Sequence, residues 1–272
     1  MQLTDTQREA YARDGFLIFP ELVTAAEVAL LRSEVGRLWD VEAEGTVREG
    51  NNKAPKSMFR MHEANGATAS APFRALSRSP RALGVAQQLL ADSDLYLHHS
   101  KVNVKAAIEG SVWPWHQDFG SWNLDGIARP DMATWMVMLD DASEISGCLY
   151  LLPGSHRWGR TEAYLDTSTA YRLWSVTPEE MKRRMAGSPP PVAVAGKAGT
   201  CAIFHCNLMH ASGHNLSHRD RWQAYFCFNT CANRPGDVAN PRPDYVRSRN
   251  WAPMQAMPDA AVLAAREPAL AP

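Results

Sequence analysis

The sequence predicts an α+β fold that is mainly β, with a double-stranded β-helix core (a cupin-like jelly-roll or barrel) and N-terminal helices packed on it. Apolar residues have helical spacing in the first third of the chain. Short segments rich in β-branched and aromatic residues, separated by Gly and Pro, follow it. Helices followed by many short strands are typical of this fold class. A chain of 272 residues has room for one sizeable core.

The helices are predicted from their ends as well as from their periodicity. Residues 4–13 have Thr4 or Asp5 as an N-terminal cap, and Gly15 ends the helix because glycine readily adopts the left-handed conformation. A second helix begins at Thr24 and runs to about Asp40, with apolar residues at helical spacing. Further helices are expected over residues 80–90 and, in a later insertion, Pro178–Met185.

We expect a single domain over residues 1–272, with a helical part at about 1–92, a β core at about 93–232 and an irregular C-terminal tail. Residues 42–72 are rich in Gly, Asn, Ala and Ser, and we expect a long loop there that could act as a lid. Residues 156–190 interrupt the strands as an insertion. The expected strands lie at 15–23, 95–106, 133–142, 147–154, 190–196, 199–206 and 222–230.

Composition excludes several classes of function. Basic and acidic side chains nearly balance, 28 against 29, which leaves no basic footprint for nucleic acid and no polybasic signal for a membrane. No long apolar run indicates a membrane span, and the N-terminus lacks the pattern of a signal peptide. The five cysteines form no CxxC pair, so we expect reduced thiols in a cytoplasmic protein. The oligomeric state is not determined by these features.

The segment Trp-Pro-Trp-His116-Gln-Asp118 carries the first indication of chemistry. In a strand, residues i and i+2 point to one face, so His116 and Asp118 would project together. Two histidines and one carboxylate on one face of a metal, with the other positions open, bind iron(II) in non-haem oxygenases. Taken alone, a histidine beside a surface aspartate is the more frequent explanation of such a pair.

A third ligand has four candidates. His205, His210, His214 and His218 cluster after the expected strand at 199–206, and composition does not choose among them.

The combined pattern resembles a known family. An HxD pair, then roughly ninety residues, then His-x-Ser with an arginine eleven positions after that histidine, is similar to the phytanoyl-CoA dioxygenase family of iron(II)/2-oxoglutarate oxygenases. The segments Trp115–Trp122 and Cys206–Ser212 most resemble its ectoine hydroxylase-like members, although the residues that follow Trp122 differ from theirs. The likeness extends from Gly15 to about residue 230.

The resemblance implies a cofactor set and its ligands. His210 would be the third ligand of Fe(II), and 2-oxoglutarate and O₂ would be the cosubstrates. Arg221 would bind the distal carboxylate of 2-oxoglutarate, with Ser212 on the same carboxylate and Asn103 nearby. A guanidinium suits this task because it binds carboxylates with two parallel hydrogen bonds and remains charged in a dry pocket. The alternative for Arg221 is a surface salt bridge with Asp220 or Asp237.

Asp118 bears on the type of reaction, because halogenases of this kind replace that carboxylate with a small residue. Its presence favours hydroxylation, or related desaturation or cyclisation. We expect hydroxylation of an unactivated C–H bond in a small polar, amino-acid-like substrate. The alternatives are tailoring of a larger natural-product scaffold and, third, oxidation of an acyl-CoA thioester.

Five residues are candidates for contact with the substrate. Trp122 and Phe119 could cage a cationic or zwitterionic molecule, with core packing as the alternative. Trp113 stands where the relatives' pattern leads us to expect a phenylalanine that packs on the substrate. Arg60 and His62 lie in the expected lid.

Lys101 and Lys105 flank Asn103 at alternate strand positions. They could contact carboxylates, but an exposed strand face is the favoured interpretation.

Two other functions compete with an oxygenase. Two histidines and a carboxylate also bind catalytic zinc, which would fit a hydrolase or a cupin-type isomerase. No additional carboxylate lies near the HxD pair as an obvious general base, and Arg221 favours a dicarboxylate cosubstrate. A non-catalytic binding protein on the same fold is the third hypothesis, and the intact set of candidate ligands argues against it.

Overall fold

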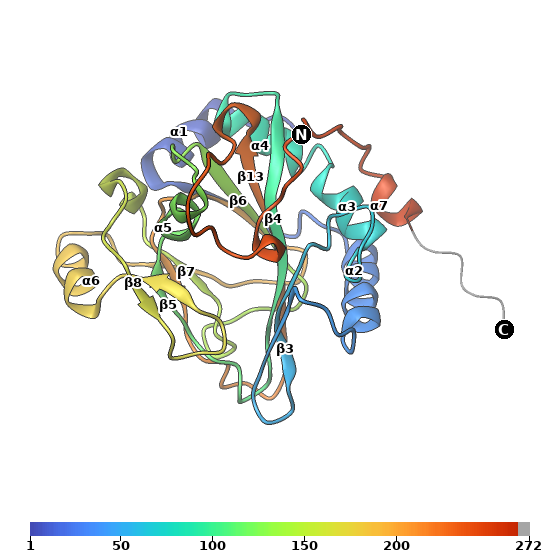
Figure 1. Ribbon diagram of the computed structural model, residues 1–272, viewed down its shortest axis with the longest axis horizontal. Coiled ribbons are helices and arrows are strands. Elements are labelled where there is room, and N and C mark those ends of the chain that lie inside the picture. The colour runs from blue at the N-terminus through green and yellow to red at the C-terminus, as the bar shows by residue number, and fades with distance from the viewer. Residues whose placement is uncertain (266–272) are drawn as a thin grey trace.

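Two antiparallel sheets form the jelly-roll core of the protein in the computed structural model, which describes residues 1–265 (Figure 1). The larger sheet contains, in spatial order, β1 (Phe16–Phe19), β11 (Cys201–His205), β6 (Met132–Met138), β13 (Arg221–Thr230), β4 (Leu95–Lys105), β3 (Ala54–Phe59) and β2 (Thr46–Glu49). The smaller sheet contains β10 (Val192–Val194), β7 (Leu149–Leu151), β12 (His210–Ser212) and β5 (Trp113–His116). The strands β8 (Tyr164–Asp166) and β9 (Leu173–Ser175) form a separate hairpin.

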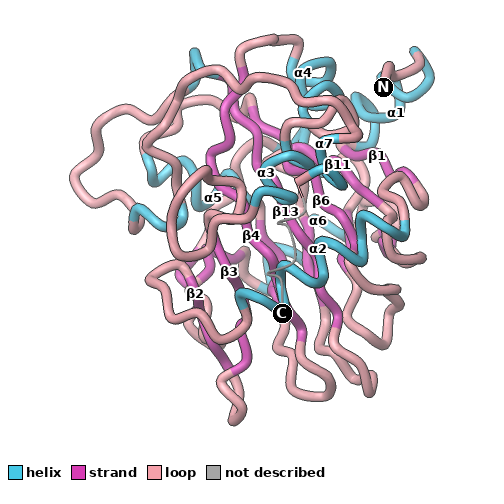
Figure 2. Tube along the Cα trace, turned by 90° about the vertical axis from the view of Figure 1, so that its right-hand side faces the viewer, coloured by secondary structure: helices cyan, strands magenta, loops and turns pink. Residues whose placement is uncertain are grey.

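Helices cover the outer face of the larger sheet, as Figure 2 shows for α2, α3 and α7. The helices on this side are α1 (Asp5–Asp14), α2 (Ala25–Leu38), α3 (Ala71–Ser77), α4 (Leu83–Leu90) and α7 (Ala261–Ala264). Leu31, Val35 and Leu38 of α2 belong to the same buried cluster as Val102 and Val104 of β4. A second apolar cluster, which includes side chains from β6, β7, β10 and β11, fills the space between the two sheets.

Local capping explains why the first two helices begin where they do. Thr4 and Gln7 form a reciprocal capping box at the start of α1, and Thr24 and Glu27 form another at the start of α2. Gly15 ends α1 with φ of 85°, a left-handed conformation. The helix predicted over Pro178–Met185 is also confirmed as α6, with Thr177 as its cap.

β4 is the strand that separates the helical side of the molecule from its interior. Its side chains alternate, so that Val102 and Val104 pack under the helices while Lys101 and Asn103 point between the sheets. β4 lies between β13 and β3, so both of its edges are hydrogen-bonded to neighbours. The interior side of this strand therefore forms a wall of the space in which candidate site residues meet.

The loop predicted over residues 42–72 is wrong in part. β2 and β3 form a hairpin there, and Ser57 of β3 pairs with Asn103 of β4, so the hairpin extends the larger sheet. The segment has weak local strand propensity, and pairing with the edge of β4 overrides it. The helix α3 was not expected either, and α4 begins at Leu83 where Pro80 had been expected.

The remaining elements are short. They are α5 (Asp118–Trp122) and the 3₁₀ turns η1 (Asn123–Asp125), η2 (Ser155–Trp158), η3 (Cys231–Asn233) and η4 (Asp244–Val246). The tail is irregular apart from η4 and α7, and the part of that expectation at 266–272 lies outside the described residues. Within residues 1–265, no helix has both the length and the apolar character needed to cross a membrane.

Candidate metal centre

His116 and Asp118 lie on either side of a strand-to-helix junction. His116 is the last residue of β5, and Asp118 is the first residue of α5, so the expectation that both belong to one strand is wrong. Gln117 fixes the junction: its side-chain NH₂ donates to the carbonyl groups of Gly159 and Asn207 at 2.8 and 2.7 Å. The chain turns between the two side chains, and they nevertheless converge.

The structure brings His116, Asp118 and His210 together. One ligand atom from each lies within 4.8 Å of the other two, and all three side chains are buried. His116 and His210 are cross-strand partners of β5 and β12, with ring centroids 4.0 Å apart. Nε2 of His210 is 3.8 Å from Oδ1 of Asp118. Among residues 1–265, this is the one group of three or more His, Cys, Asp or Glu side chains with such spacing.

Backbone carbonyl groups set the tautomer of both histidines. Nδ1 of His116 is 2.7 Å from the carbonyl oxygen of Pro114, and Nδ1 of His210 is 2.9 Å from that of Leu208. A carbonyl only accepts hydrogen bonds, so Nδ1 carries the proton and Nε2 keeps its lone pair. Burial lowers the pKa of each imidazole, which keeps both rings neutral. Neutral rings with free Nε2 lone pairs are what a metal ligand requires.

A hydrogen bond from Thr134 orients the carboxylate of Asp118. Oγ1 of Thr134, on β6, lies 2.9 Å from Oδ2 of Asp118, which leaves Oδ1 on the side of the histidines. Ligands oriented in this way by neighbouring hydrogen bonds are typical of metal sites in proteins. Two imidazoles and one carboxylate therefore fit iron(II), and Thr134 is a member of the site that the sequence did not indicate.

The other three candidate histidines lie outside this group. Nδ1 of His205 accepts a hydrogen bond from the backbone N–H of Asn207 at 3.0 Å, and its ring packs against His156. His214 and His218 are exposed.

A cavity adjoins the three converging side chains. Of the predicted site residues, it is lined by Asn103, Trp113, Ser212 and Arg221 in addition to the three candidate ligands. These residues come from β4, β5, β12 and β13, so both sheets contribute to its walls.

Arg221 is a buried cation without an acidic partner among the described residues. It is 1% exposed and forms neither of the salt bridges that were considered as an alternative. Nη2 donates to the carbonyl of Gly147 at 2.7 Å, Nη1 donates to the side-chain carbonyl of Gln223, and Nε has no partner. Burial lowers the pKa of its guanidinium. An unneutralised buried guanidinium is costly unless an anion occupies the cavity, so Arg221 is a carboxylate-binding candidate.

Asn103 and Ser212 approach the same cavity from opposite walls. The side-chain oxygen of Asn103 accepts a hydrogen bond of 2.7 Å from Ser57, which leaves its NH₂ group available to donate. Ser212 is the last residue of β12, two positions after His210. Both are placed to hydrogen-bond a ligand that lies between Arg221 and the three candidate metal ligands.

The interpretation of Lys101 and Lys105 as an exposed strand face is wrong. Lys101 is 8% exposed and lies in the cavity, with Nζ 5.1 Å from the ring centroid of Trp113 and 5.5 Å from that of Tyr225. Lys105 is fully buried and donates to the carbonyl of Gly213. The reason is the central position of β4, which neighbours cover on both edges.

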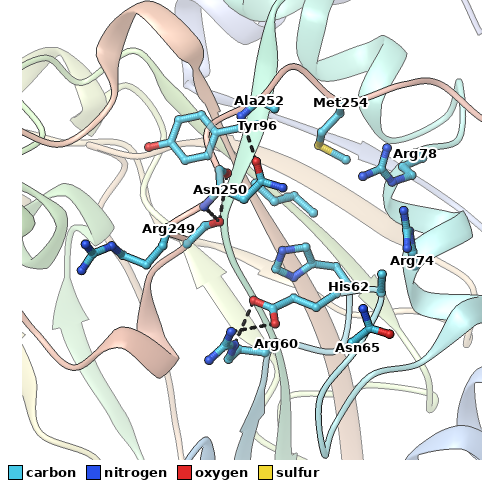
Figure 3. A pocket seen from close by; sticks show the side chains of 14 residues that line it. Arg60, His62, Asn65, Arg74, Arg78, Tyr96, Arg249, Asn250, Ala252 and Met254 are labelled. Atoms are coloured by element: carbon cyan, nitrogen blue, oxygen red, sulfur yellow. Dashed lines mark hydrogen bonds and ion pairs between the residues drawn. The ribbon is translucent and has the colours of Figure 1, made fainter.

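Phe119 and Trp122 do not line the cavity. They belong to an apolar cluster with Ile127, Met132, Cys206 and Cys227. The ring of Trp122 meets the rings of His98 and His99 edge-on. Their placement matches the core-packing alternative. Arg60 and His62 also lie outside this cavity, and both line a separate one that is shown in Figure 3.

Comparison with known proteins decides the family. The sequence model described as Phytanoyl-CoA dioxygenase (PhyH) matches residues 11–222. The chain belongs to the phytanoyl-CoA dioxygenase family. Among curated relatives, L-proline trans-4-hydroxylase of Streptomyces griseoviridis is 32% identical over 90% of this chain and 92% of its own length. Ectoine dioxygenase of Bordetella bronchiseptica is also 32% identical, over 91% of this chain and 83% of its own length.

Solved structures agree with this assignment to the phytanoyl-CoA dioxygenase family. The crystal structure of EctD from S. alaskensis with 2-oxoglutarate and 5-hydroxyectoine has a TM-score of 0.80 and 28% identity, and covers 94% of this chain and 88% of its own. The structure of the same protein with bound Fe has the same TM-score and identity. The predicted family and fold are thereby confirmed.

Proposed function

We propose that the chain is an iron(II)- and 2-oxoglutarate-dependent dioxygenase that hydroxylates an unactivated C–H bond of a small polar, amino-acid-like substrate. The observation that carries this proposal is the position of Arg221. A buried guanidinium without an acidic partner lines the same cavity as two neutral histidines and a carboxylate. A dicarboxylate cosubstrate accounts for such a cation, because a guanidinium binds a carboxylate with two parallel hydrogen bonds.

Each residue has a distinct task in this proposal. His116, Asp118 and His210 would hold the iron, and the cavity adjoins all three side chains. When bound, iron, 2-oxoglutarate and O₂ supply the oxidising chemistry. The protein supplies orientation and a dry pocket.

The cosubstrate would be held at its distal carboxylate. Arg221 binds that carboxylate, Ser212 adds a hydroxyl donor, and the NH₂ group of Asn103 donates from the wall opposite. Asp118 supplies a carboxylate where halogenases of this kind have a small residue, which favours hydroxylation over halogenation.

The lining of the cavity supports a small zwitterionic substrate. Trp113 and Tyr225 provide ring faces, and Lys101 provides a cation that a substrate carboxylate can pair with. L-proline and ectoine, the compounds that appear in the names of the relatives, are molecules of this kind.

The balanced charge and five free cysteines favour a cytoplasmic location and a reaction that does not involve nucleic acid.

A larger scaffold is the second candidate, because a wider groove lies beside the cavity. Tyr171 packs its ring 5.1 Å from that of Trp113 and also lines an open groove of about 910 Å³ with Arg172, Arg242 and Tyr245. A natural-product substrate for hydroxylation, desaturation or cyclisation would extend from the cavity into this groove.

Anaerobic reconstitution tests the proposal. We expect iron(II) and 2-oxoglutarate together to give a visible absorption band, and a screen of L-proline, ectoine and other small zwitterions to find one that stimulates succinate formation. His210→Ala should lose metal binding, and His205→Ala, outside the metal group, should keep it. Absence of the band, together with full metal binding by His210→Ala, would refute the proposal. Stimulation by large scaffolds alone would favour the second candidate.

A further inference from the structure

A second cavity lies on the outer side of β4, away from the metal centre. Its walls are formed by residues 60–65, which follow β3, by α3 and the start of β4, and by the segment at 248–254 (Figure 3). With its open mouth, the cavity has a volume of about 1030 Å³. Ser100 of β4 contacts His62 on this side, whereas the next residue, Lys101, lines the metal-site cavity. Because neighbouring strand residues point to opposite faces, the two cavities are separate.

The lining of this cavity has a surplus of positive charge. It contains four arginines, Arg60, Arg74, Arg78 and Arg249, and one acidic residue, Glu63. Glu63 forms an ion pair with Arg60, with 2.8 Å between Oε2 and Nη2. Arg249 has a single distant carboxylate contact, at 3.4 Å with a residue outside the lining.

Arg74 and Arg78 have no acidic partner among residues 1–265. The guanidinium of Arg74 makes no hydrogen bond to any described residue, and Figure 3 shows it on the same side of the cavity as Arg78. Arg78 donates from Nη1 to the carbonyl of Gln255 at 3.1 Å, but its Nε is buried and has no partner. Burial, and then the charge of Arg74, lower the pKa of Arg78. Two like charges four residues apart repel each other, and a buried donor without an acceptor adds to that cost.

His62 lies between the arginines and contributes hydrogen bonding without charge. Its Nδ1 is 2.7 Å from the hydroxyl of Ser100. Burial and the nearby arginines lower its pKa to about 3, so the ring is neutral at physiological pH. The side chains of Asn65 and Asn250 add amide groups to the lining.

We propose that this cavity binds a small oxyanion with two or more negative charges, a phosphate-type group or a polycarboxylate, between Arg74 and Arg78. Such an anion would accept from the guanidinium groups of Arg74 and Arg78, and it would remove their mutual repulsion. The positive electrostatic potential of Arg60 and Arg249 would attract the anion to the cavity. This site is independent of the proposed reaction, and its ligand would bind in a different cavity from the one that Arg221 lines.

The bound anion would also secure the C-terminal segment. The N–H of Ser248 donates to the carbonyl of His98 at 2.6 Å, and the N–H of Met254 donates to that of Leu95 at 2.8 Å. The residues between these two anchors form the far wall of the cavity. An anion held by α3 on one side and by Arg249 on the other would therefore raise the thermal unfolding midpoint.

The test is calorimetric titration of the metal-free protein with phosphate, pyrophosphate or citrate against chloride at matched ionic strength. We expect saturable binding with one site, at least about tenfold weaker in Arg74→Gln/Arg78→Gln. Arg129→Gln/Arg183→Gln changes the charge equally at exposed positions and should bind as the wild type does. Preference among the three anions separates the phosphate-type source from the polycarboxylate source.

Two further variants keep the outcome decisive. Arg74→Gln alone removes no hydrogen bond of the folded protein, so it should fold normally and still weaken binding. Arg221→Met removes the cation of the metal-site cavity and should leave this binding intact. Equal binding of chloride and the polyvalent anions, or loss of binding in Arg221→Met with retention in Arg74→Gln/Arg78→Gln, would overturn the proposal.

Discussion

Thr134 donates a hydrogen bond of 2.9 Å to Oδ2 of Asp118, and this contact holds the carboxylate edge toward His116 and His210. The donor is on β6 and the acceptor is on α5, so the larger sheet directly positions a candidate iron ligand. The same hydroxyl lies 3.5 Å from Sγ of Cys227. Because a hydroxyl has one proton, the shorter contact to the carboxylate takes it.

Thr134→Val is expected to weaken iron(II) binding by roughly 10- to 100-fold, because it removes an orienting hydrogen bond while keeping the shape of the side chain. Anaerobic titration with iron(II) measures this. Thr161→Val is the matched control, since Thr161 is equally buried and its hydroxyl has no side-chain partner. Equal iron affinity of wild type and Thr134→Val would show that the contact does not tune the site.

Arg221→Lys is expected to raise the KM for 2-oxoglutarate by about 10- to 100-fold. A lysine keeps the charge but loses the planar pair of donors that a carboxylate binds. Circular dichroism checks the fold, and succinate formation gives the KM. Arg219→Lys, at an exposed position two residues earlier, should leave the KM unchanged. A KM that is the same for Arg221→Lys and the wild type would remove Arg221 from the cosubstrate site.

The lowered pKa of Lys105 leads us to expect that binding of 2-oxoglutarate is coupled to the uptake of a proton. Burial, followed by the charges of Arg221 and Lys56, lowers the pKa of Lys105 to about 6, and the opposing effects of Glu49 and Cys148 are smaller. The side-chain amine of Lys105 is therefore mostly unprotonated and neutral at pH 7.5. A carboxylate on Arg221 cancels part of that repulsion and raises the pKa, so the complex takes up a proton.

The affinity for 2-oxoglutarate is thus expected to fall as pH rises from about 6 to about 8. Calorimetry in two buffers with different ionisation enthalpies counts the protons, and Lys105→Met should abolish the uptake. The unfolded chain, with an ordinary lysine pKa, binds more protons than the folded chain between about 6 and 10.5. The free energy of unfolding from this group therefore rises with pH over that window. Buffer-independent binding enthalpy in the wild type would contradict the link.

Substitution of Trp113 and of Trp122 distinguishes a role in substrate binding from a role in core packing. Trp113 lines the cavity, so Trp113→Leu should raise the KM for the substrate in addition to lowering the free energy of unfolding. Trp122 is buried in an apolar cluster, so Trp122→Leu should lower the free energy of unfolding by about 2 to 4 kcal/mol and leave the KM near its wild-type value. Steady-state kinetics and urea unfolding measure the pair. The reverse assignment of effects would restore Trp122 as a substrate-caging residue.

Local signals were the ones that could be predicted from the sequence. Thr4 and Thr24 cap their helices through residues three positions away, so the pattern contains the whole interaction. The candidate ligands were predictable for a different reason, because their residue types and spacing resemble a family. His210 could be separated from its neighbouring histidines only by that resemblance, and the structure then placed it opposite His116.

Properties that depend on distant pairing could not be predicted. The hairpin of β2 and β3 forms because β4 offers an edge, and nothing within residues 42–72 records that edge. Lys101 alternates like a solvent-facing residue, and only the position of β4 inside the sheet buries it. Thr134 is one polar residue in an apolar strand, and its role requires knowing where Asp118 lies.

The pairing of His116 with His210 ties the metal centre to the late steps of folding. The two residues are roughly ninety positions apart, and the chain between them must close a large loop before β5 and β12 meet, which is slow. A shift of one residue in that pairing would turn one imidazole to the other face of the sheet. Iron would therefore bind chains that have completed this long-range pairing and would withdraw them from the folding equilibrium, so metal supplied during refolding should raise the yield without accelerating the first steps.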